Sequence, residues 1–348
     1  MVDGRAHLDY EPKCLKTSAV VFWPGSEVEG QYPTHYLKYD NSLPFEKRVD
    51  YLLKQLEQDD PPSFLAAYFN EPDHSGHIFG PNSPEIDAVI RRVDNVTGYL
   101  LKSLRNRGLL DQVDLVITSD HGMAEINSSR LIILDEFVSS DWYTLISHSG
   151  SHSNQIQDVY FHVLPKDGKL DKTYQQLKRA PHLHVYLKEE IPEEFHYKHN
   201  RRVMPIFIVA DDGWTITKNA SQIYGHGNHG YSNKYPDMHP FFVAQGPAFK
   251  NNFISEPFEN VHIYTLLCHV LGVDPSPNNG SLQAVQQLLK IAPVKFTQDF
   301  TVLVVICVIS FLVFMLMSYG IVSFCVKNHC RMRQYGHIYD LGTTDFDL

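Results

Sequence analysis

Three short stretches of the sequence place aspartate and histidine beside glycine: "PDHSGH" at 72–77, "SDHG" at 119–122 and "GNHGY" at 227–231. Carboxylate oxygens and imidazole nitrogens bind zinc, and side chains four residues apart lie on one side of a helical turn. Two divalent ions about 3.5–4 Å apart can stabilise both oxygens of a phosphoryl displacement. We therefore predict a metal site from five side chains: Asp73, His77, Asp120, His121 and His229.

The alternative for these histidines is a structural role, in which hydrogen bonds hold them in the core or on the surface. Three separate Asp/His motifs beside glycine favour metal binding, because glycine lets the backbone approach a metal closely. For four other histidines we favour the structural role and predict that they are not ligands: His74, His148, His152 and His226.

Short apolar runs rich in β-branched and aromatic residues alternate with helical patterns at 45–58 and 83–108. This alternation favours an α/β layered domain with a largely parallel sheet, whose chemistry gathers at the carboxyl ends of the strands. Residues 165–202 are polar and charged, which indicates a peripheral helix-strand excursion. The expected strands are 18–23, 64–69, 114–119, 159–165, 204–210 and 240–246.

The composition limits the classes of function. The chain has 348 residues, 43% of them apolar and 12% aromatic, which is enough for a sizeable core. Its formal charge of −10 argues against a partner such as a nucleic-acid duplex, whose phosphates call for a basic surface. The 19 histidines fit metal binding instead.

The stretch Thr301–Cys325 contains no charged residue and is long enough to cross a lipid bilayer as a helix. Lys327, Arg331 and Arg333 follow it, so the positive-inside rule places the C-terminus in the cytoplasm and the N-terminus outside. We therefore expect a single-pass type I plasma-membrane protein. Its predicted parts are an extracellular domain at 1–274, a juxtamembrane stalk at 275–300, a transmembrane helix at 301–325 and a cytoplasmic tail at 326–348.

Two further features bear on this topology. Four N-x-S/T triplets, which start at Asn95, Asn127, Asn219 and Asn279, fit a glycoprotein. The first residues, "MVDGRAHLDYEPKC", contain no apolar stretch that would serve as an export signal. We therefore expect an N-terminal segment to be missing from this sequence. The five cysteines imply no disulfide framework.

Seven motifs in order resemble the ectonucleotide pyrophosphatase/phosphodiesterase family, over about Leu15 to Leu289. The resemblance implies an alkaline-phosphatase-like fold and two Zn²⁺ ions. It also implies hydrolysis of phosphodiester or pyrophosphate bonds in extracellular nucleotides or dinucleotides. The motifs are "VFWPGSEVEG", "NSLPFEKRV", "EPDHSGHIFGP", "ITSDHGMAE", "GNHGYSN", "MHPFFVAQGPAF" and "PNNGS".

The resemblance also assigns roles to individual residues. Asp73, His77 and His229 resemble the ligands of one zinc ion, and Asp120 and His121 resemble those of the other. Tyr39 resembles the aromatic residue that stacks on the nucleotide base, and Trp23 resembles a residue that shapes the same pocket. The alternative for both aromatic residues is an ordinary place in the core.

The chain departs from the family at two positions. The family's nucleophilic threonine and one metal aspartate precede the Trp-Pro-Gly segment, which here stands at 23–25. Thr34 follows that segment and is interpreted as part of the base-binding stretch, and Asp3 lacks the apolar strand that would precede a metal aspartate. We therefore identify no catalytic nucleophile and expect impaired hydrolysis.

Two alternatives stay open. The first is a non-catalytic membrane ectodomain that binds a metal ion or a nucleotide. The second is another enzyme of the alkaline-phosphatase superfamily, such as a sulfatase-like or phosphoglycerate mutase-like one, which the base-stacking segment disfavours. Hydrolysis of a nucleotide diester but not of a phosphomonoester would separate the two enzyme classes.

Overall fold

The computed structural model describes residues 17–146, 157–219 and 223–290, all within one compact unit that ends at Lys290. The predicted transmembrane helix and cytoplasmic tail, at 301–325 and 326–348, lie outside the described residues. Within the described part of the chain, no helix combines the length and the apolar character needed to cross a bilayer.

Three parallel strands form the first sheet: β1 (Ser18–Val21), β2 (His35–Leu37) and β3 (Phe64–Ala67), in the order β2-β1-β3. The crossover from β2 to β3 contains helix α1 (Phe45–Leu56). The helices α2 (Asp73–Phe79) and α3 (Pro84–Asn106) follow β3. All three strands run in the same direction, so their carboxyl ends lie at one edge of the sheet.

The helices pack through apolar residues at helical spacing. Phe45, Val49 and Leu53 recur every four residues on α1 and are buried against Val96 and Leu104 of α3. The hydroxyl of Ser83 accepts a hydrogen bond from the Ile86 amide at 3.2 Å, and Pro84 occupies the first turn, so α3 begins with a strong cap.

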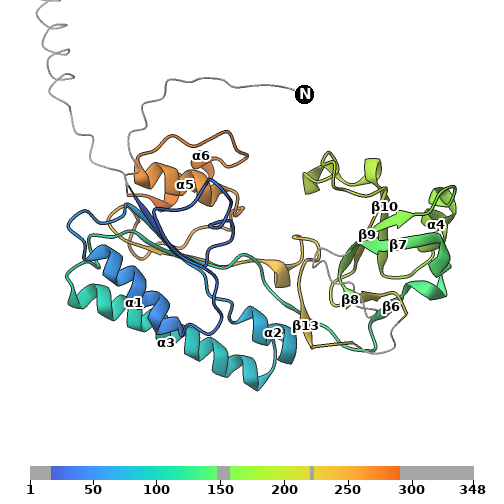
Figure 1. The fold of residues 1–348 in the computed structure, drawn as a ribbon, viewed down its shortest axis with the longest axis horizontal. Coiled ribbons are helices and arrows are strands. Elements are labelled where there is room, and N and C mark those ends of the chain that lie inside the picture. Colours follow the sequence, from blue (N-terminus) through green and yellow to red (C-terminus); the bar gives the residue numbers. More distant parts are fainter. Residues whose placement is uncertain (1–16, 147–156, 220–222, 291–348) are drawn as a thin grey trace, which may run out of the picture. The chain divides into compact units, whose positions relative to one another are not determined.

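A second group of elements packs on β4 (Leu115–Thr118), which pairs antiparallel with β14 (Phe242–Gln245). Helix α5 (His262–Leu271), helix α6 (Leu282–Val285) and the 3₁₀ turn η6 (Gln286–Leu288) follow in the chain. In Figure 1, α5 and α6 lie on the opposite side of the strands from α1 and α3. Residues 282–289 of the predicted stalk thus pack on the domain, where Phe249, Leu266, Val285, Leu288 and Leu289 form a buried cluster.

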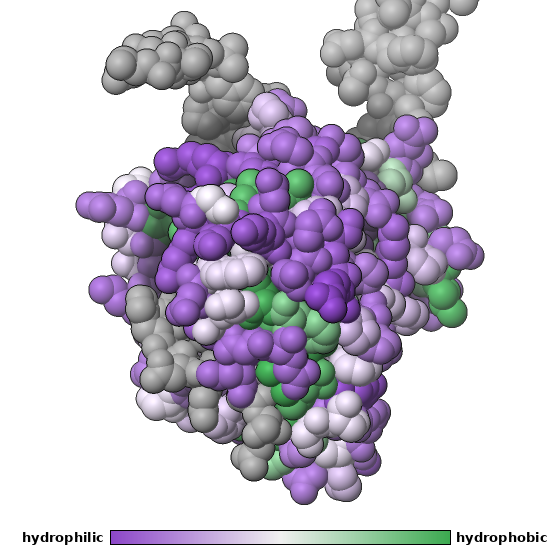
Figure 2. Space-filling model, turned by 90° about the vertical axis from the view of Figure 1, so that its right-hand side faces the viewer, coloured by the Kyte–Doolittle hydropathy of each residue, from purple (hydrophilic) through white to green (hydrophobic). Residues whose placement is uncertain are grey.

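The region between these groups forms an antiparallel sheet with the order β10-β11-β9-β7. Its strands are β7 (Tyr143–Ile146), β9 (Tyr160–Pro165), β10 (Leu183–Leu187) and β11 (Ile206–Ala210). Helix α4 (Leu170–Leu177) and β10 correspond to the predicted helix-strand excursion. Every residue of β11 is buried. On the surface of the molecule, Figure 2 shows an apolar area among hydrophilic side chains.

Five short strands lie outside this sheet. The strands are β5 (Ala124–Glu125), β6 (Leu131–Ile133), β8 (Gln157–Asp158), β12 (Thr215–Thr217) and β13 (Gly227–Asn228). The remaining turns are η1 (Leu134–Glu136), η2 (Ser140–Trp142), η3 (Lys188–Glu190), η4 (Glu193–Phe195) and η5 (Pro236–Met238).

The α/β prediction is confirmed, but the expectation of a largely parallel sheet is corrected for the described strands. They form five small sheets, in which only β2-β1-β3 and the pair β6-β12 are parallel. The physical reason lies in which strands are neighbours. β9 and β10, which α4 connects, are not paired with each other, because β11 lies between them and runs antiparallel to both. β4 likewise pairs with β14, which comes from far along the chain and runs in the opposite direction.

Candidate metal centre

The predicted site residues follow the carboxyl ends of four strands. Trp23 comes two residues after β1, Tyr39 two residues after β2, and Asp120 two residues after β4. Asp73 follows β3 and is the first residue of α2. Segments that are far apart in sequence therefore supply side chains to the strand ends, as is usual for α/β enzymes.

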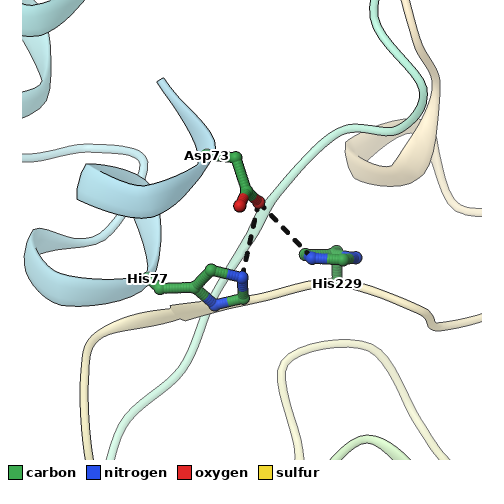
Figure 3. Close-up of side chains that lie close together, drawn as sticks. All are labelled: Asp73, His77 and His229. Carbon is green, nitrogen blue, oxygen red and sulfur yellow. Dashed lines mark ion pairs between the residues drawn. The ribbon is translucent and has the colours of Figure 1, made fainter. Parts of the chain in front are cut away.

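Three of the predicted metal ligands meet in one cluster, which Figure 3 shows. Asp73 and His77 are one helical turn apart on α2, and the Nε2 atom of His77 is 3.4 Å from Oδ1 of Asp73. His229 comes from the segment after β13, and its Nε2 atom is also 3.4 Å from the same oxygen. The three side chains thus point their ligand atoms at one another.

Glycine allows the two elements to approach. A Cβ atom on Gly227 would lie 2.3 Å from the carbonyl oxygen of Gly76, so β13 and α2 can pack this closely only without a side chain there. The Gly227 carbonyl lies 3.0 Å from Nδ1 of His77, so it can accept a hydrogen bond from that nitrogen. This contact leaves Nε2 as the nitrogen with a free lone pair, as in many histidine ligands of metals.

The cluster fits a tetrahedral metal ion. Oδ1 of Asp73 is buried and has no hydrogen-bond partner, although an unsatisfied buried oxygen is costly. Distances of 3.4 Å to two Nε2 atoms exceed normal N–H···O hydrogen bonds. Ligands about 2.0–2.1 Å from a zinc ion lie about 3.3–3.4 Å from one another in a tetrahedron. The spacing is therefore that of ligands around a cation.

The protonation states agree with this interpretation. Burial acts to raise the pKa of Asp73, but the neighbouring His77 together with His229 and His121 brings that pKa below its ordinary value. Burial, with a further contribution from His121, lowers the pKa of His229 to about 4, so its imidazole is neutral at pH 7 and can donate a lone pair. The carboxylate of Asp73 raises the pKa of His77, so a metal ion that binds Nε2 of His77 would displace a proton from it.

The second predicted pair is less enclosed. The His121 ring stacks on His229 with centroids 3.5 Å apart, and its Nε2 atom lies 3.9 Å from Oδ1 of Asp73. Asp120 lies 3.6 Å from His121, and 72% of its side chain is exposed. Among the described residues, only Asp73, His77 and His229 form a group of three close ligands. Asp120 and His121 adjoin that group without completing a second one.

The predicted substrate-binding aromatics are both half-exposed. Tyr39 rests edge-on against Phe22 with ring centroids 5.4 Å apart, and its hydroxyl donates to Asn41 at 3.0 Å. Tyr39 and Trp23 expose 52% and 48% of their surface, so neither is an ordinary core residue. Both residues follow the carboxyl ends of their strands.

Thr34 lies at the other end of the strands. The Ser18 amide donates to Oγ1 of Thr34 at 3.2 Å, and Ser18 is the first residue of β1. Asp73 follows the carboxyl end of β3, so β1 and β2 run between Thr34 and the edge with the metal cluster. His74 and His226 are exposed, and His148 and His152 lie outside the described residues.

Sequence reasoning missed Arg48, which is fully buried. Its guanidinium stacks over the rings of Phe22 and Phe45, and it donates to the carbonyl of Tyr68 at 3.2 Å. Arg48 thereby ties together the carboxyl ends of β1 and β3. Phe45 lies three residues before Arg48 on α1 and is buried, which could have suggested that Arg48 also points inward. A charged side chain is usually exposed, however, so the sequence favoured a surface position.

Tyr68 was also missed. It follows β3 directly, and burial together with the charges of Asp120 and Asp73 raises the pKa of its hydroxyl. The Tyr68 hydroxyl is therefore near enough to the candidate metal ligands Asp73 and Asp120 for their charges to act on it. Only its place at a strand end marked it in the sequence.

The fold is an alkaline-phosphatase-like α/β fold with a candidate metal site, and sequence comparison identifies the family. The model of the family "Type I phosphodiesterase / nucleotide pyrophosphatase" matches residues 6–232. The chain belongs to this family, whose members are nucleotide pyrophosphatases and phosphodiesterases. The resemblance inferred from the motifs is thus confirmed.

Two human relatives are similar to this chain in sequence. Human ectonucleotide pyrophosphatase/phosphodiesterase family member 5 is 43% identical over 279 residues, which cover 79% of this chain and 57% of the relative. Human bis(5'-adenosyl)-triphosphatase ENPP4 is 39% identical, with 79% and 59% covered. The chain therefore spans less than two thirds of these relatives.

Solved structures are also similar. That of human ENPP5 has a TM-score of 0.74 and 42% identity, covering 79% of this chain and 72% of that one. An inactive murine ENPP5 in complex with AMP has the same TM-score and coverage, with 44% identity.

Proposed function

We propose that this chain carries a zinc-dependent site for hydrolysis of phosphodiester or pyrophosphate bonds in extracellular nucleotides. The observation that carries the proposal is the cluster of Asp73, His77 and His229, with its buried, unpartnered oxygen and tetrahedral spacing. A zinc ion held there would stabilise negative charge on phosphoryl oxygens.

A second zinc ion would take Asp120 and His121, which adjoin the first cluster. The second site has two protein ligands in this proposal, so it is expected to bind more weakly than the first. The resemblance to proteins named for bis(5'-adenosyl)-triphosphate hydrolysis and for AMP binding supports a nucleotide substrate.

The open ring of Tyr39 would hold the nucleotide base by stacking, and Trp23 would border it. Base–aromatic stacking contributes about 1–3 kcal/mol and tolerates any base. We assign no nucleophile. Thr34 lies at the amino end of the strands and not beside the metal cluster, which supports impaired turnover. We also propose the type I plasma-membrane topology, with bilayer contact through residues 301–325.

The second candidate function is metal or nucleotide binding without catalysis. The exposed Asp120 favours it, because a site with one well-enclosed metal cluster can bind a phosphate without supplying the second ion. The two candidates share the metal cluster and differ only in turnover.

The experiment uses the purified full chain in detergent, loaded with zinc. AMP binding is measured by calorimetry, and turnover is measured with p-nitrophenyl thymidine 5'-monophosphate and with p-nitrophenyl phosphate. We expect AMP binding to weaken about tenfold or more in Tyr39→Ala, from the loss of stacking. The matched control is Tyr32→Ala, since Tyr32 has the same 52% exposure but precedes β2.

The outcomes separate the candidates. Zinc-dependent cleavage of the diester, faster than that of the monoester, supports the hydrolase. AMP binding without cleavage supports the binding function. Absence of zinc-dependent AMP binding, or equal losses in the two tyrosine variants, contradicts the proposed site.

A further inference from the structure

An apolar tip stands out in the loop between β14 and α5. Ile254 exposes 94% of its surface, the largest value among the exposed large hydrophobic residues of the described chain, and Phe253 beside it exposes 42%. Asn252 has a φ of 52°, a left-handed conformation that asparagine tolerates and that turns the chain sharply before the tip. The turn therefore presents two apolar side chains to the surroundings.

The base of this loop is held firmly. The Lys250 amide donates to the Leu288 carbonyl at 2.9 Å, and the Lys290 amide donates to the Ala248 carbonyl at 2.8 Å. Between them, Phe249 forms a β-bridge with Leu289, and both residues are buried. The tip at 253–254 thus lies only a few residues from the last described residue, Lys290.

The length of the following chain limits how far a membrane can be from Lys290. Ten residues, 291–300, separate it from the apolar stretch Thr301–Cys325. Fully extended, ten residues span at most about 33–36 Å. The four residues from Lys250 to Ile254 reach at most about 14 Å. A bilayer that contains residues 301–325 therefore lies at most about 36 Å from the loop base, and the tip reaches it when the ten connecting residues are not fully extended.

The charges near the tip point to apolar insertion rather than attraction to acidic lipids. The Lys250 ammonium lies 4.9 Å from the Phe253 ring centroid, which places a cation beside the aromatic residue. Glu256 and Glu259 are exposed in the same loop, so the loop carries no excess of positive charge. Aromatic and aliphatic side chains with a nearby lysine are typical of the membrane–water interface.

We infer that the loop 250–260 contacts the outer leaflet of the membrane and inserts Phe253 and Ile254 at the level of the lipid headgroups. The inference rests on the proposed membrane attachment. Contact at this loop would orient the domain on the bilayer, because the tip and the C-terminal connection would then fix two neighbouring points of the domain. The partner is a zwitterionic lipid surface.

The test uses the full chain reconstituted in phosphatidylcholine vesicles, with tryptophan as a probe of depth. Ile254→Trp is compared with Ile90→Trp, which replaces a residue 49% exposed on α3, on the other side of the strands from α5. Lipids brominated near the headgroup should quench the added fluorescence of Ile254→Trp at least twofold more than that of Ile90→Trp. The unfolding temperatures of both variants should match that of the unchanged chain.

Vesicle flotation separates the two levels of the proposal. If the chain floats with the vesicles but the two tryptophans are quenched equally, the loop contact is wrong and the attachment stands. If the chain does not float, both the attachment and the loop contact are wrong. Stronger quenching of Ile254→Trp that appears only with acidic lipids, and disappears in salt, contradicts apolar insertion.

Discussion

Asp73 and Asp211 each have two histidine nitrogens close to their carboxylate oxygens. Of these two clusters, only the one at Asp73 fits a metal ion. Asp73 has two imidazole Nε2 atoms at 3.4 Å from a single oxygen, which is buried and has no hydrogen bond. Asp211 has His182 Nδ1 at 3.0 Å from one oxygen and His184 Nε2 at 2.7 Å from the other. The residue types are the same, and the spacing differs.

The difference shows that distances, and not residue types, identify a metal site. Each oxygen of Asp211 is satisfied by a normal hydrogen bond, and His182 also stacks on Trp214 with centroids 3.8 Å apart. Neighbouring strands β10 and β11 hold this cluster closed. His77 comes from α2 and His229 from the segment after β13, which meet through glycine backbone, and their Nε2 atoms lie 3.4 Å from the Asp73 oxygen.

The largest expected effect comes from replacing the aspartate in each of the two clusters, Asp73 and Asp211, and measuring zinc affinity. Asp73→Asn should weaken zinc binding by more than 100-fold, because loss of a hydrogen-bond partner of a metal ligand alone costs about 10–100-fold and Asp73 is a proposed direct ligand. Asp211→Asn is the matched control and should change zinc affinity less than twofold. Competition with a chromogenic chelator measures both constants. Similar losses in the two variants would mean that zinc does not bind at Asp73.

Three of the five predicted ligands, Asp73, His77 and His229, lie together in the structure, and their signals in the sequence are local. The spacing of Asp73 and His77 and the glycines around His229 are visible in short stretches. The closed cluster at Asp211 was not foreseen, since His182 and His184 stand in a polar stretch whose pairing with β11 depends on tertiary contacts. The burial of Arg48 was missed for the same reason, because three aromatic rings from separate segments surround its charge.

The direction of strand pairing was the weaker part of the fold prediction. Apolar runs such as 159–165 and 204–210 identified β9 and β11, but a period of two is the same in parallel and antiparallel strands. The parallel prediction held where the helix α1 separates β2 from β3. The direction of the other pairs depends on which strands are neighbours, such as β4 with β14 and β11 with β9, and the sequence did not reveal this.

The backbone packing of β13 on α2, beside the cluster of Asp73, His77 and His229, provides a second way to test the comparison with Asp211. Gly227→Ala would place a Cβ atom 2.3 Å from the Gly76 carbonyl and 3.1 Å from the Met123 sulfur, so β13 must move away from α2. We expect a loss of about 1–3 kcal/mol in unfolding free energy from overpacking, and about tenfold weaker zinc binding as His77 loses its carbonyl partner.

Gly98→Ala is the matched control for this substitution. Gly98 lies inside α3, and a Cβ atom there meets nothing within 4 Å. Alanine should stabilise the helix by about 0.5–1 kcal/mol. Denaturant unfolding and chelator competition measure both effects. Unchanged zinc affinity in Gly227→Ala would show that the packing of β13 on α2 does not position the cluster.

The smallest effect concerns the stability that the closed cluster supplies, and its sign follows from the pKa of Asp211. Burial acts to raise that pKa, but the hydrogen bonds of His182 and His184 bring it below its ordinary value of 3.8. A carboxyl group with a lowered pKa in the folded state stabilises the fold above pH 3.8, and this contribution disappears as the pH falls through the folded-state pKa. Because the cluster is partly exposed, Asp211→Asn should cost only about 0.5–1 kcal/mol at pH 7. Thermal unfolding of the two proteins between pH 7 and pH 3 should show this gap closing only in the acid range. A gap that stays constant across the range would mean that Asp211 acts through packing against His182 rather than through its charge.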